Sequence, residues 1–307
     1  MQKTWHTGMK TLVRALGAVA VLAAALSLTR VPSATAASHH ALNPHSGGGR
    51  SCITVHTATA ANTFGNYTFI DDFFSEDDSS FSYFVTQRLT ADAYNPHNVG
   101  VFYNTSLRHW AIYNEDDAPM PIGAAFNVYL ASVCNTSDIA FFHEAANFNS
   151  SANYTVINNP LVNGNPNLEL FVTHNYNRGG FGGILDDHPL GVWYTPDGHW
   201  SIFHEDGTAL PWGADYNILV KARGGFIHQT TADNSAWTWT WMDTGLLNNL
   251  PGAAILVTPI WNPYGLGSGV YVTSPLEVMY DDSRNQWAIF TPDWAVAPGA
   301  DFNVYRL

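Results

Sequence analysis

The sequence predicts an all-β protein that consists of three tandem small antiparallel β-sandwich or barrel domains. Three observations predict this class: one pattern recurs three times, short β-branched and aromatic runs alternate with turn residues, and no 3.6-residue periodicity persists beyond the N-terminal region. The chain has 307 residues, of which 46% are hydrophobic and 14% aromatic. This composition is sufficient to bury a core and excludes a disordered chain.

The repeated pattern is clearest over residues 190 to 220, and copies of it run over 99 to 130 and 276 to 307. Each copy is anchored by one tryptophan, preceded by a Val-Thr pair and opened by a histidine. These residues are Trp110, Trp200 and Trp287; Val85-Thr86, Val172-Thr173 and Val257-Thr258; and His56, His143 and His228. The spacings define units of roughly 85 to 90 residues, which is long enough for a small domain. We therefore predict β repeats over 52–137, 138–222 and 223–307.

Within the second unit, runs rich in Val, Ile, Thr and aromatic residues predict six strands. They are placed near 139–144, 153–158, 168–175, 190–195, 199–204 and 214–221. Between the fourth and fifth strands, Pro196-Asp197-Gly198 favours a hairpin turn. Such short connections predict antiparallel pairing of the strands. The spacing of the strands along the chain is consistent with either a sandwich or a barrel.

Alternation along the strands predicts which side chains are buried. In each unit the anchor tryptophan shares a face with an isoleucine two residues later, which indicates the core. The opposite face carries a small residue followed by an aromatic residue: Ala111 and Tyr113, Ser201 and Phe203, and Ala288 and Phe290. The last strand of each unit places an amide at one position, namely Asn127, Asn217 and Asn303. A buried hydrogen bond to a neighbouring loop and a contact with a ligand are both consistent with this amide.

The N-terminus has the pattern of a secretory signal peptide over 1–37, because basic residues precede an apolar run at 15–28 and a small-residue stretch at 33–37. An uncleaved anchor is the alternative, but the 14-residue run is shorter than the roughly 20 residues that span a bilayer. We expect a secreted, extracellular protein with no membrane association after cleavage. Residues 38–51 are predicted to be a flexible leader. Removal of 1–37 leaves 8 basic and 25 acidic residues, a net charge of −17.

Charge and motifs exclude several functions. A strongly acidic chain has no basic surface for nucleic acid. It also lacks the zinc-protease helix, the nucleophile elbow and the phosphate-binding loop, so we expect no catalytic residue, no enzyme activity and no cofactor. Glu115 and Glu205 are repeat-equivalent, but the third unit has Pro292 there, which is weak evidence for a glycosidase. Asp116, Asp206 and Asp293 recur after the fifth strand of each unit and suit loop-fixing hydrogen bonds.

Cysteine and histidine usage gives two further expectations. Cys52 and Cys134 are the two cysteines of the chain, and in an exported protein they are predicted to form a disulfide that closes the first unit. Two separate buried thiols are the alternative. The equivalent histidines His56, His143 and His228 would hold a metal only if the units met around a threefold axis, so we predict that each binds within its own unit and that no metal is bound.

The mature chain resembles an uncharacterised family of bacterial secreted tandem β-repeat proteins that are rich in Trp and Asn. The residues that carry the resemblance are Asn163-Gly164-Asn165-Pro166-Asn167, Val172-Thr173-His174-Asn175-Tyr176-Asn177, Gly191-Val192-Trp193-Tyr194, Trp200-Ser201-Ile202-Phe203 and Gly213-Ala214. The resemblance implies exported tandem β modules and transfers no catalytic residue. The first and third units depart from it, and the first has Gln87-Arg88-Leu89-Thr90 in place of residues 174–177.

Two classes of function follow. The first is a non-catalytic extracellular binding protein for glycan or another cell-surface ligand, because amides and aromatic rings together suit sugars. We place its site in the second unit, at Asn175, Tyr176, Asn177, His188, Trp193 and Trp212. The second class is an extracellular structural, matrix or surface-layer protein, in which these tryptophans would pack internally; a secreted hydrolase ranks third. Exposure of Trp193 and Trp212 beside polar loops discriminates the first two. No feature of the sequence fixes an oligomeric state.

Overall fold

The computed structural model describes residues 52–70, 78–90, 93–131, 139–180, 182–221, 223–293 and 295–307. These ranges contain 21 β-strands, two short 3₁₀ helices over Arg178–Gly180 and Pro263–Gly265, and no α-helix. The predicted all-β class is therefore confirmed. Among the described residues there is no helix with the length and apolar character needed to cross a membrane. The predicted signal peptide and leader lie outside the described residues.

Each repeat contributes seven strands in the same order. The first contributes β1 (Ile53–Thr57), β2 (Thr63–Phe64), β3 (Tyr67–Phe69), β4 (Tyr83–Arg88), β5 (Val99–Asn104), β6 (His109–Asn114) and β7 (Ala125–Leu130). The second contributes β8 (Ile139–Glu144), β9 (Ser150–Ser151), β10 (Tyr154–Ile157), β11 (Glu169–Asn175), β12 (Leu190–Tyr194), β13 (Trp200–His204) and β14 (Asp215–Lys221). The third contributes β15 (Gly225–Gln229), β16 (Ser235–Ala236), β17 (Trp239–Met242), β18 (Ile255–Pro259), β19 (Glu277–Asp281), β20 (Gln286–Phe290) and β21 (Asp301–Arg306).

The six strands predicted for the second unit are confirmed to within one residue at each end; the two-residue strand β9 was not predicted. The predicted hairpin joins β12 to β13, where Gly198 has a φ of 88° and donates its N–H to the Thr195 carbonyl at 3.0 Å. Within every repeat the strands form two antiparallel groups. In the second repeat these are β8-β14-β11 and β12-β13-β10-β9.

The sheets continue from one repeat into the next, which the sequence did not predict. The four-stranded group of the first repeat joins the three-stranded group of the second through parallel pairing of β5 and β11, and β19 joins β4 in the same way. At the remaining junction Val192 forms a parallel bridge with Ile260, just after β18. One backbone hydrogen bond recurs at all three junctions: Tyr176 N–H to Val101, Trp261 N–H to Val192 and Leu89 N–H to Val278. The three repeats therefore close into a circle.

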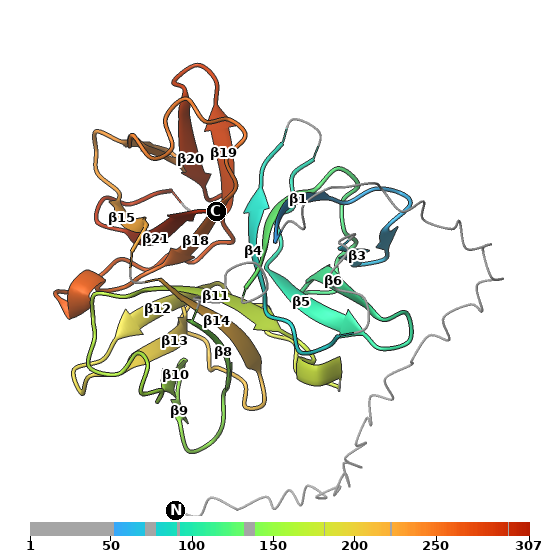
Figure 1. Cartoon of the computed structure of the whole chain (residues 1–307). Coiled ribbons are helices and arrows are strands. Elements are labelled where there is room, and N and C mark those ends of the chain that lie inside the picture. Colours follow the sequence, from blue (N-terminus) through green and yellow to red (C-terminus); the bar gives the residue numbers. More distant parts are fainter. Residues whose placement is uncertain are drawn as a thin grey trace, which may run out of the picture. The chain divides into compact units, whose positions relative to one another are not determined.

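The strands β4, β11 and β18, one from each repeat, contact one another at the centre of this circle (Figure 1). Each Val-Thr pair noted in the sequence is part of a cyclic set of hydrogen bonds. The valine N–H of one repeat donates to the threonine hydroxyl of the next: Val85 to Thr173 at 3.1 Å, Val172 to Thr258 at 3.3 Å and Val257 to Thr86 at 3.0 Å. Because each threonine serves a neighbouring repeat, the repeats are mutually dependent for the pairing of buried backbone groups.

The recurrent asparagines form a second cyclic set. Asn127 donates its amide to the Ile255 carbonyl, Asn217 to Tyr83 and Asn303 to Leu170, at 3.0, 2.9 and 3.0 Å. All three amides are fully buried. The sequence was consistent with either a buried hydrogen bond or a ligand contact, and the structure shows the buried hydrogen bond. The acceptor belongs to a strand of the neighbouring repeat, whereas a loop was expected.

Each repeat has its own hydrophobic core on the face predicted from alternation. Trp110, Trp200 and Trp287 are completely buried, and each indole N–H donates to a loop carbonyl at 2.9 to 3.0 Å. The recurrent aspartates behave as predicted in two repeats, since Asp116 accepts from Ala118 N–H and Asp206 from Thr208 N–H, both at 3.0 Å. These contacts fix the turn that follows the buried strand.

The three recurrent histidines also behave as predicted. His56, His143 and His228 each contact a threonine of their own repeat through Nε2, at 2.7 to 2.8 Å. Burial lowers the pKa of His143 and His228 to about 4, so these imidazoles are neutral. Cys52 is buried where β1 begins, and its carbonyl accepts the Leu130 N–H at 2.8 Å. Cys134 lies outside the described residues, so the disulfide remains a prediction.

Candidate functional site

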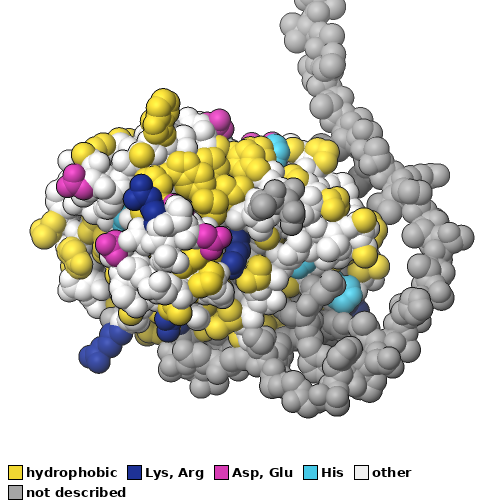
Figure 2. All heavy atoms as spheres, turned by 90° about the horizontal axis from the view of Figure 1, so that it is seen from above, with side chains coloured by type: hydrophobic (Ala, Val, Ile, Leu, Met, Phe, Trp, Pro, Cys, Tyr) yellow, Lys and Arg dark blue, Asp and Glu magenta, His cyan; other side chains and the backbone are white. Residues whose placement is uncertain are grey.

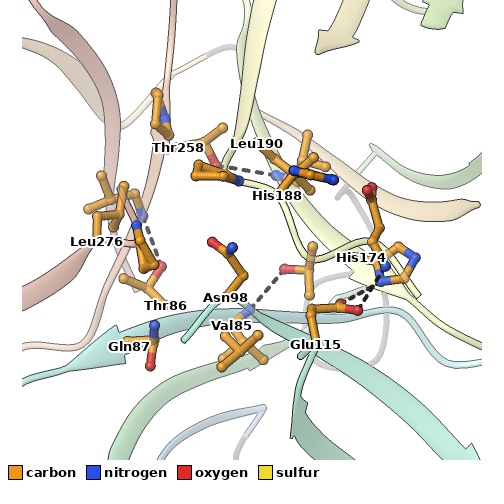
Figure 3. Close-up of a pocket in the computed structure, with 18 of the residues that line it drawn as sticks. Val85, Thr86, Gln87, Asn98, Glu115, His174, His188, Leu190, Thr258 and Leu276 are labelled. Atoms are coloured by element: carbon orange, nitrogen blue, oxygen red, sulfur yellow. Dashed lines mark hydrogen bonds and ion pairs between the residues drawn. The ribbon is translucent and has the colours of Figure 1, made fainter. Parts of the chain in front are cut away.

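A pocket of about 100 Å³ lies where the three repeats meet (Figure 3). Its lining repeats the threefold pattern, because equivalent residues of all three repeats line it. They are Val85, Val172 and Val257; Thr86, Thr173 and Thr258; Gln87, His174 and Pro259; and Val99, Leu190 and Leu276. We call this the axial pocket. Its ionisable lining consists of Glu115, His174, Asp186 and His188, all from the junction of the first two repeats.

A buried carboxylate closes each junction beside the axial pocket. Glu115 accepts the Asp186 N–H at 3.1 Å, and Glu205 accepts the Val272 N–H at 2.9 Å. In the third repeat, Pro292 replaces this glutamate, yet Glu277 accepts the Asn95 N–H at 3.1 Å. Asn95, Asp186 and Val272 are equivalent in the three repeats, so the same role is performed by a glutamate from a different strand.

Glycines explain why only one of the two strands carries the glutamate. Glu277 is equivalent to Gly100 and Gly191, and a Cβ at either glycine would overlap a carboxylate oxygen of Glu115 or Glu205. A glutamate directly after the second strand of the hairpin therefore requires glycine on the first strand, whereas the third repeat has glutamate on the first strand and proline after the second. Glu115 and Glu205, whose recurrence was weak evidence for a glycosidase, each accept a backbone N–H at a different junction.

Three positions beside these carboxylates differ in chemical class between repeats. The first repeat has amides, Gln87, Asn95 and Asn114, and the Asn95 amide donates to the other two at 2.8 Å. The third repeat has Pro259, Val272 and Thr291. The second repeat alone places three ionisable side chains there, His174, Asp186 and His204. All three are at most 2% exposed.

The ionisable side chains of the second repeat are paired with one another and with tyrosines. His174 Nδ1 lies 2.5 Å from Glu115, which also accepts the Tyr113 hydroxyl at 2.6 Å. Asp186 lies 2.8 Å from His204 Nε2 and accepts the Tyr216 hydroxyl at 2.5 Å. Two imidazoles and two carboxylates are thus enclosed beside the axial pocket, and we call this the buried ionisable cluster.

The charges of the cluster shift its pKa values. Burial alone would lower the pKa of His174, but the neighbouring Glu115 and Asp186 carboxylates raise it above its ordinary value. Burial would raise the pKa of Asp186, but contacts with His204, the charge of His174 and the Tyr216 hydroxyl hold it below its ordinary value. These contacts therefore favour the protonated imidazole of His174 and the anionic carboxylate of Asp186.

A different surface is presented by the four-stranded group of each repeat. Its outward side carries the small residue and the aromatic residue that alternation indicated, flanked by further rings. Figure 2 shows one face of the molecule, on which hydrophobic side chains gather in a patch. We call these surfaces the aromatic faces. The first contains Phe64, Tyr67, Phe69, Phe102, Tyr113 and Tyr176, the second Tyr154, Trp193, Phe203, Trp261 and Tyr271, and the third Tyr94, Trp239, Trp241, Met279 and Phe290.

The rings on each face contact one another at their edges or faces. On the second face Tyr154 and Trp193 are perpendicular at 5.7 Å, and on the third face Trp239 stacks on Phe290 at 4.3 Å. Each face also carries rings from the neighbouring repeat. These are Tyr176 on the first face, Trp261 and Tyr271 on the second and Tyr94 on the third. Most of these rings are partly exposed.

The comparisons with known proteins identify a family. The model of a domain of unknown function (DUF7452) matches the chain three times, over residues 35–130, 100–220 and 195–306. The chain belongs to the DUF7452 family. The later two DUF7452 matches each begin in the four-stranded group of the preceding repeat and end in the last strand of their own. No curated protein and no solved structure matches the chain.

Within this DUF7452 protein, the predicted amides of the ligand site are buried in its framework. Asn175 donates to Asn217 at 3.0 Å. Asn177 accepts the Tyr103 N–H at 2.7 Å and donates to the Tyr103 carbonyl at 2.8 Å, so it joins the first two repeats. Tyr176 is partly exposed and lies on the first aromatic face, at 6.0 Å from Tyr113.

The remaining three predicted residues are dispersed. His188 lines the axial pocket and contacts Asp206 through Nδ1 at 2.7 Å. Trp193 is partly exposed on the second aromatic face. Trp212 is 65% exposed in the turn before β14, apart from that face. The six residues therefore do not form one site.

Sequence reasoning missed the buried ionisable cluster and the aromatic faces as units. Asp186 belongs to the adjacent acidic pair Asp186-Asp187, a pattern typical of a solvated turn, but it is 2% exposed. The sequence feature that could have identified Asp186 is the difference between repeats, because the equivalent residues Asn95 and Val272 are not ionisable. The aromatic faces had a clearer signal in the small-then-aromatic alternation, which recurs in all three copies.

Proposed function

We propose that this DUF7452 protein is exported and binds neutral carbohydrate without catalysing a reaction, through its three aromatic faces. The observation that carries the proposal is the recurrence of partly exposed rings on the outward side of all three four-stranded groups. Sugar rings present flat apolar C–H faces, for which an aromatic ring is a suitable partner. Export follows from the predicted signal peptide of residues 1–37.

The charge of the chain supports neutral ligands over acidic ones. Removal of the signal peptide leaves a net charge of −17, which would repel sulfated or uronic polysaccharides. The third face has polar groups beside its rings: the Trp241 indole N–H donates to Asp281 at 2.9 Å, and the Arg284 guanidinium lies 4.1 Å from the centre of the Trp241 ring. These groups can bind sugar hydroxyls next to a stacked ring.

Exposure of the predicted tryptophans also supports binding over a matrix role. Trp193 and Trp212 would be internal in a protein whose tryptophans serve only to pack, whereas both reach solvent in this fold. Three similar faces on one chain would add avidity, since weak sites on a common scaffold bind a polymer more tightly than one site does.

The test is binding of the full mature chain to a panel of neutral oligosaccharides and polysaccharides, followed by titration calorimetry. We expect Trp193→Ala and Trp239→Ala to weaken binding about 2- to 10-fold each, as for loss of one aromatic contact of about 0.5–1.5 kcal/mol. Phe148→Ala is the control, because Phe148 is 86% exposed in the turn between β8 and β9, outside the aromatic faces. Absence of any panel ligand, or equal binding by all three variants, would overturn the proposal.

A further inference from the structure

Three side chains of the second repeat converge beside the axial pocket. Asp186 and His188 belong to the loop between β11 and β12, and His204 ends β13. One potential ligand atom from each lies within 4.8 Å of the others. The Asp186 and His204 side chains are completely buried, and Asp186 Oδ1 lies 2.8 Å from His204 Nε2. The His188 and His204 imidazoles are stacked, with their ring centres 4.6 Å apart.

The other polar atom of each of these residues is held by a different neighbour. The contacts are Tyr216 hydroxyl to Asp186 Oδ2 at 2.5 Å, His188 Nδ1 to Asp206 at 2.7 Å and His204 Nδ1 to Thr208 at 3.0 Å. This arrangement leaves Asp186 Oδ1, His188 Nε2 and His204 Nε2 as the atoms that can bind a shared ligand. Metal-binding imidazoles are characteristically oriented in this way, with one nitrogen held by a carboxylate or another acceptor and the other nitrogen on the metal.

Buried polar atoms without a hydrogen bond provide the second observation. Asp186 Oδ1 and His204 Nε2 are inaccessible to solvent and have no hydrogen-bonding partner of good geometry among the described residues, although they lie close to each other. Buried polar atoms of this kind are costly unless something binds them. A cation placed between them would satisfy both.

In the first repeat, the positions equivalent to Asp186, His188 and His204 do not bring three potential metal ligands together. Its equivalents are Asn95, His97 and Asn114, where the two amides bond each other at 2.8 Å. His97 still contacts Asp116 through Nδ1 at 2.7 Å, as His188 contacts Asp206. The pairing of histidine with aspartate is therefore common to both repeats, whereas the Asp–His pair is specific to the second.

We propose that Asp186, His188 and His204 bind one divalent transition metal ion, with zinc as the best match. Two imidazole nitrogens and one carboxylate oxygen are a characteristic zinc ligand set, whereas calcium and magnesium require mainly oxygen ligands. Three protein ligands leave a fourth position for water or a ligand group, and the axial pocket, which Asp186 and His188 line, adjoins it. Ligands of tetrahedral zinc are roughly 3.3 Å apart, so the Asp186 and His204 side chains separate by about half an ångström on binding.

The test uses the full mature chain with His39, His40 and His45 changed to alanine, so that the leader cannot bind metal. The protein is stripped with chelator and titrated with cobalt(II), whose visible absorption reports tetrahedral coordination, and then with zinc. We expect one ion per chain. We expect His204→Asn and Asp186→Asn to weaken binding at least 100-fold, and Asp206→Asn to weaken it about 10- to 100-fold through the orientation of His188.

The fold supplies matched controls. The double change Asp186→Asn and His204→Asn recreates the bonded amide pair of the first repeat, so it should abolish binding while urea unfolding remains cooperative. His97→Asn alters the equivalent histidine of the first repeat and should leave binding unchanged. A stripped chain that takes up no cobalt or zinc, or a double variant that binds as the parent does, would overturn the proposal and identify Asp186 and His204 as a metal-free ion pair.

Discussion

The carboxylate of Glu277 accepts a hydrogen bond at 3.1 Å from the backbone N–H of Asn95, 182 residues earlier in the chain. This contact joins the third repeat to the first, as Glu115 and Glu205 join the other junctions. Because Glu277 is 2% exposed, its removal leaves a buried N–H without an acceptor. We expect Glu277→Ala to lower the free energy of unfolding by about 1–3 kcal/mol, measured by urea denaturation at pH 5.5. A loss below about 0.5 kcal/mol would show that the junction does not depend on this bond.

Two of the buried junction carboxyls make stability fall as the pH rises. Burial raises the pKa of Glu205 to about 8 and that of Glu277 to about 7, from the ordinary 4.5. Above pH 4.5 the unfolded chain releases these protons while the folded chain retains them. The free energy of unfolding therefore falls through this window, by about 1.4 kcal/mol per pH unit for each group. We expect Glu205→Gln to be close to the parent in stability at pH 5 and more stable at pH 8. Parallel losses in both proteins between these pH values would contradict this.

The buried histidines affect the free energy of unfolding at acidic pH. The pKa of His143 and of His228 is lowered to about 4 by burial, so between pH 6.5 and 4 the unfolded chain binds protons that the folded chain does not. Stability is lost progressively as the pH falls through this window. We expect His143→Gln, whose amide can still reach Thr155, to lose less stability than the parent between pH 6.5 and 4. Urea denaturation at these two pH values measures the difference, and equal losses would contradict the assignment.

The cyclic threonine hydrogen bonds give a prediction about cooperation between repeats. Thr173→Val keeps the shape of the side chain but removes the acceptor of the Val85 N–H, which lies in the neighbouring repeat. We expect a loss of about 1–3 kcal/mol, with a single unfolding transition followed by both fluorescence and circular dichroism. Thr173→Ser is the control, because it retains the hydroxyl. Separate transitions in the parent would show that the repeats unfold independently.

The predicted disulfide between Cys52 and Cys134 would enclose most of the first repeat. A loop of this length is expected to stabilise the fold by about 4 kcal/mol in the chain-entropy model. Thiol titration of the denatured, exported protein should find no free thiol, and the double change to serine should lower stability accordingly. Two reactive thiols would establish the separate buried cysteines instead.

Strand positions could be predicted because they depend on local alternation. The tryptophan face and the small-then-aromatic face were both evident along single strands, as for Trp200, Ser201 and Phe203. Parallel pairing between β5 and β11 has no local signal, since it is determined by packing between segments about 70 residues apart. The same limitation concealed Glu277, which replaces a glutamate that proline eliminates from the expected position.

The candidate site was less predictable for a related reason. Asn175 and Asn177 looked like ligand-binding amides because their sequence context is polar, yet both are buried and bonded to the framework. Asp186 and His204 are 18 residues apart and come together only through the hairpin of β12 and β13. Their equivalents in the first repeat bond as neutral amides, so the ionic character of the pair becomes meaningful only when the repeats are superimposed.

Closure of the three repeats into a circle sets the number of copies. In an open array every added copy finds the same neighbour surface, so duplication or deletion of one unit leaves a foldable chain. Here β19 of the last repeat pairs with β4 of the first, and a fourth copy would have to be inserted between them. We therefore expect the number of repeats to stay at three during evolution, while the sequences of the individual repeats diverge. The amide, ionisable and apolar versions of one junction are an instance of such divergence.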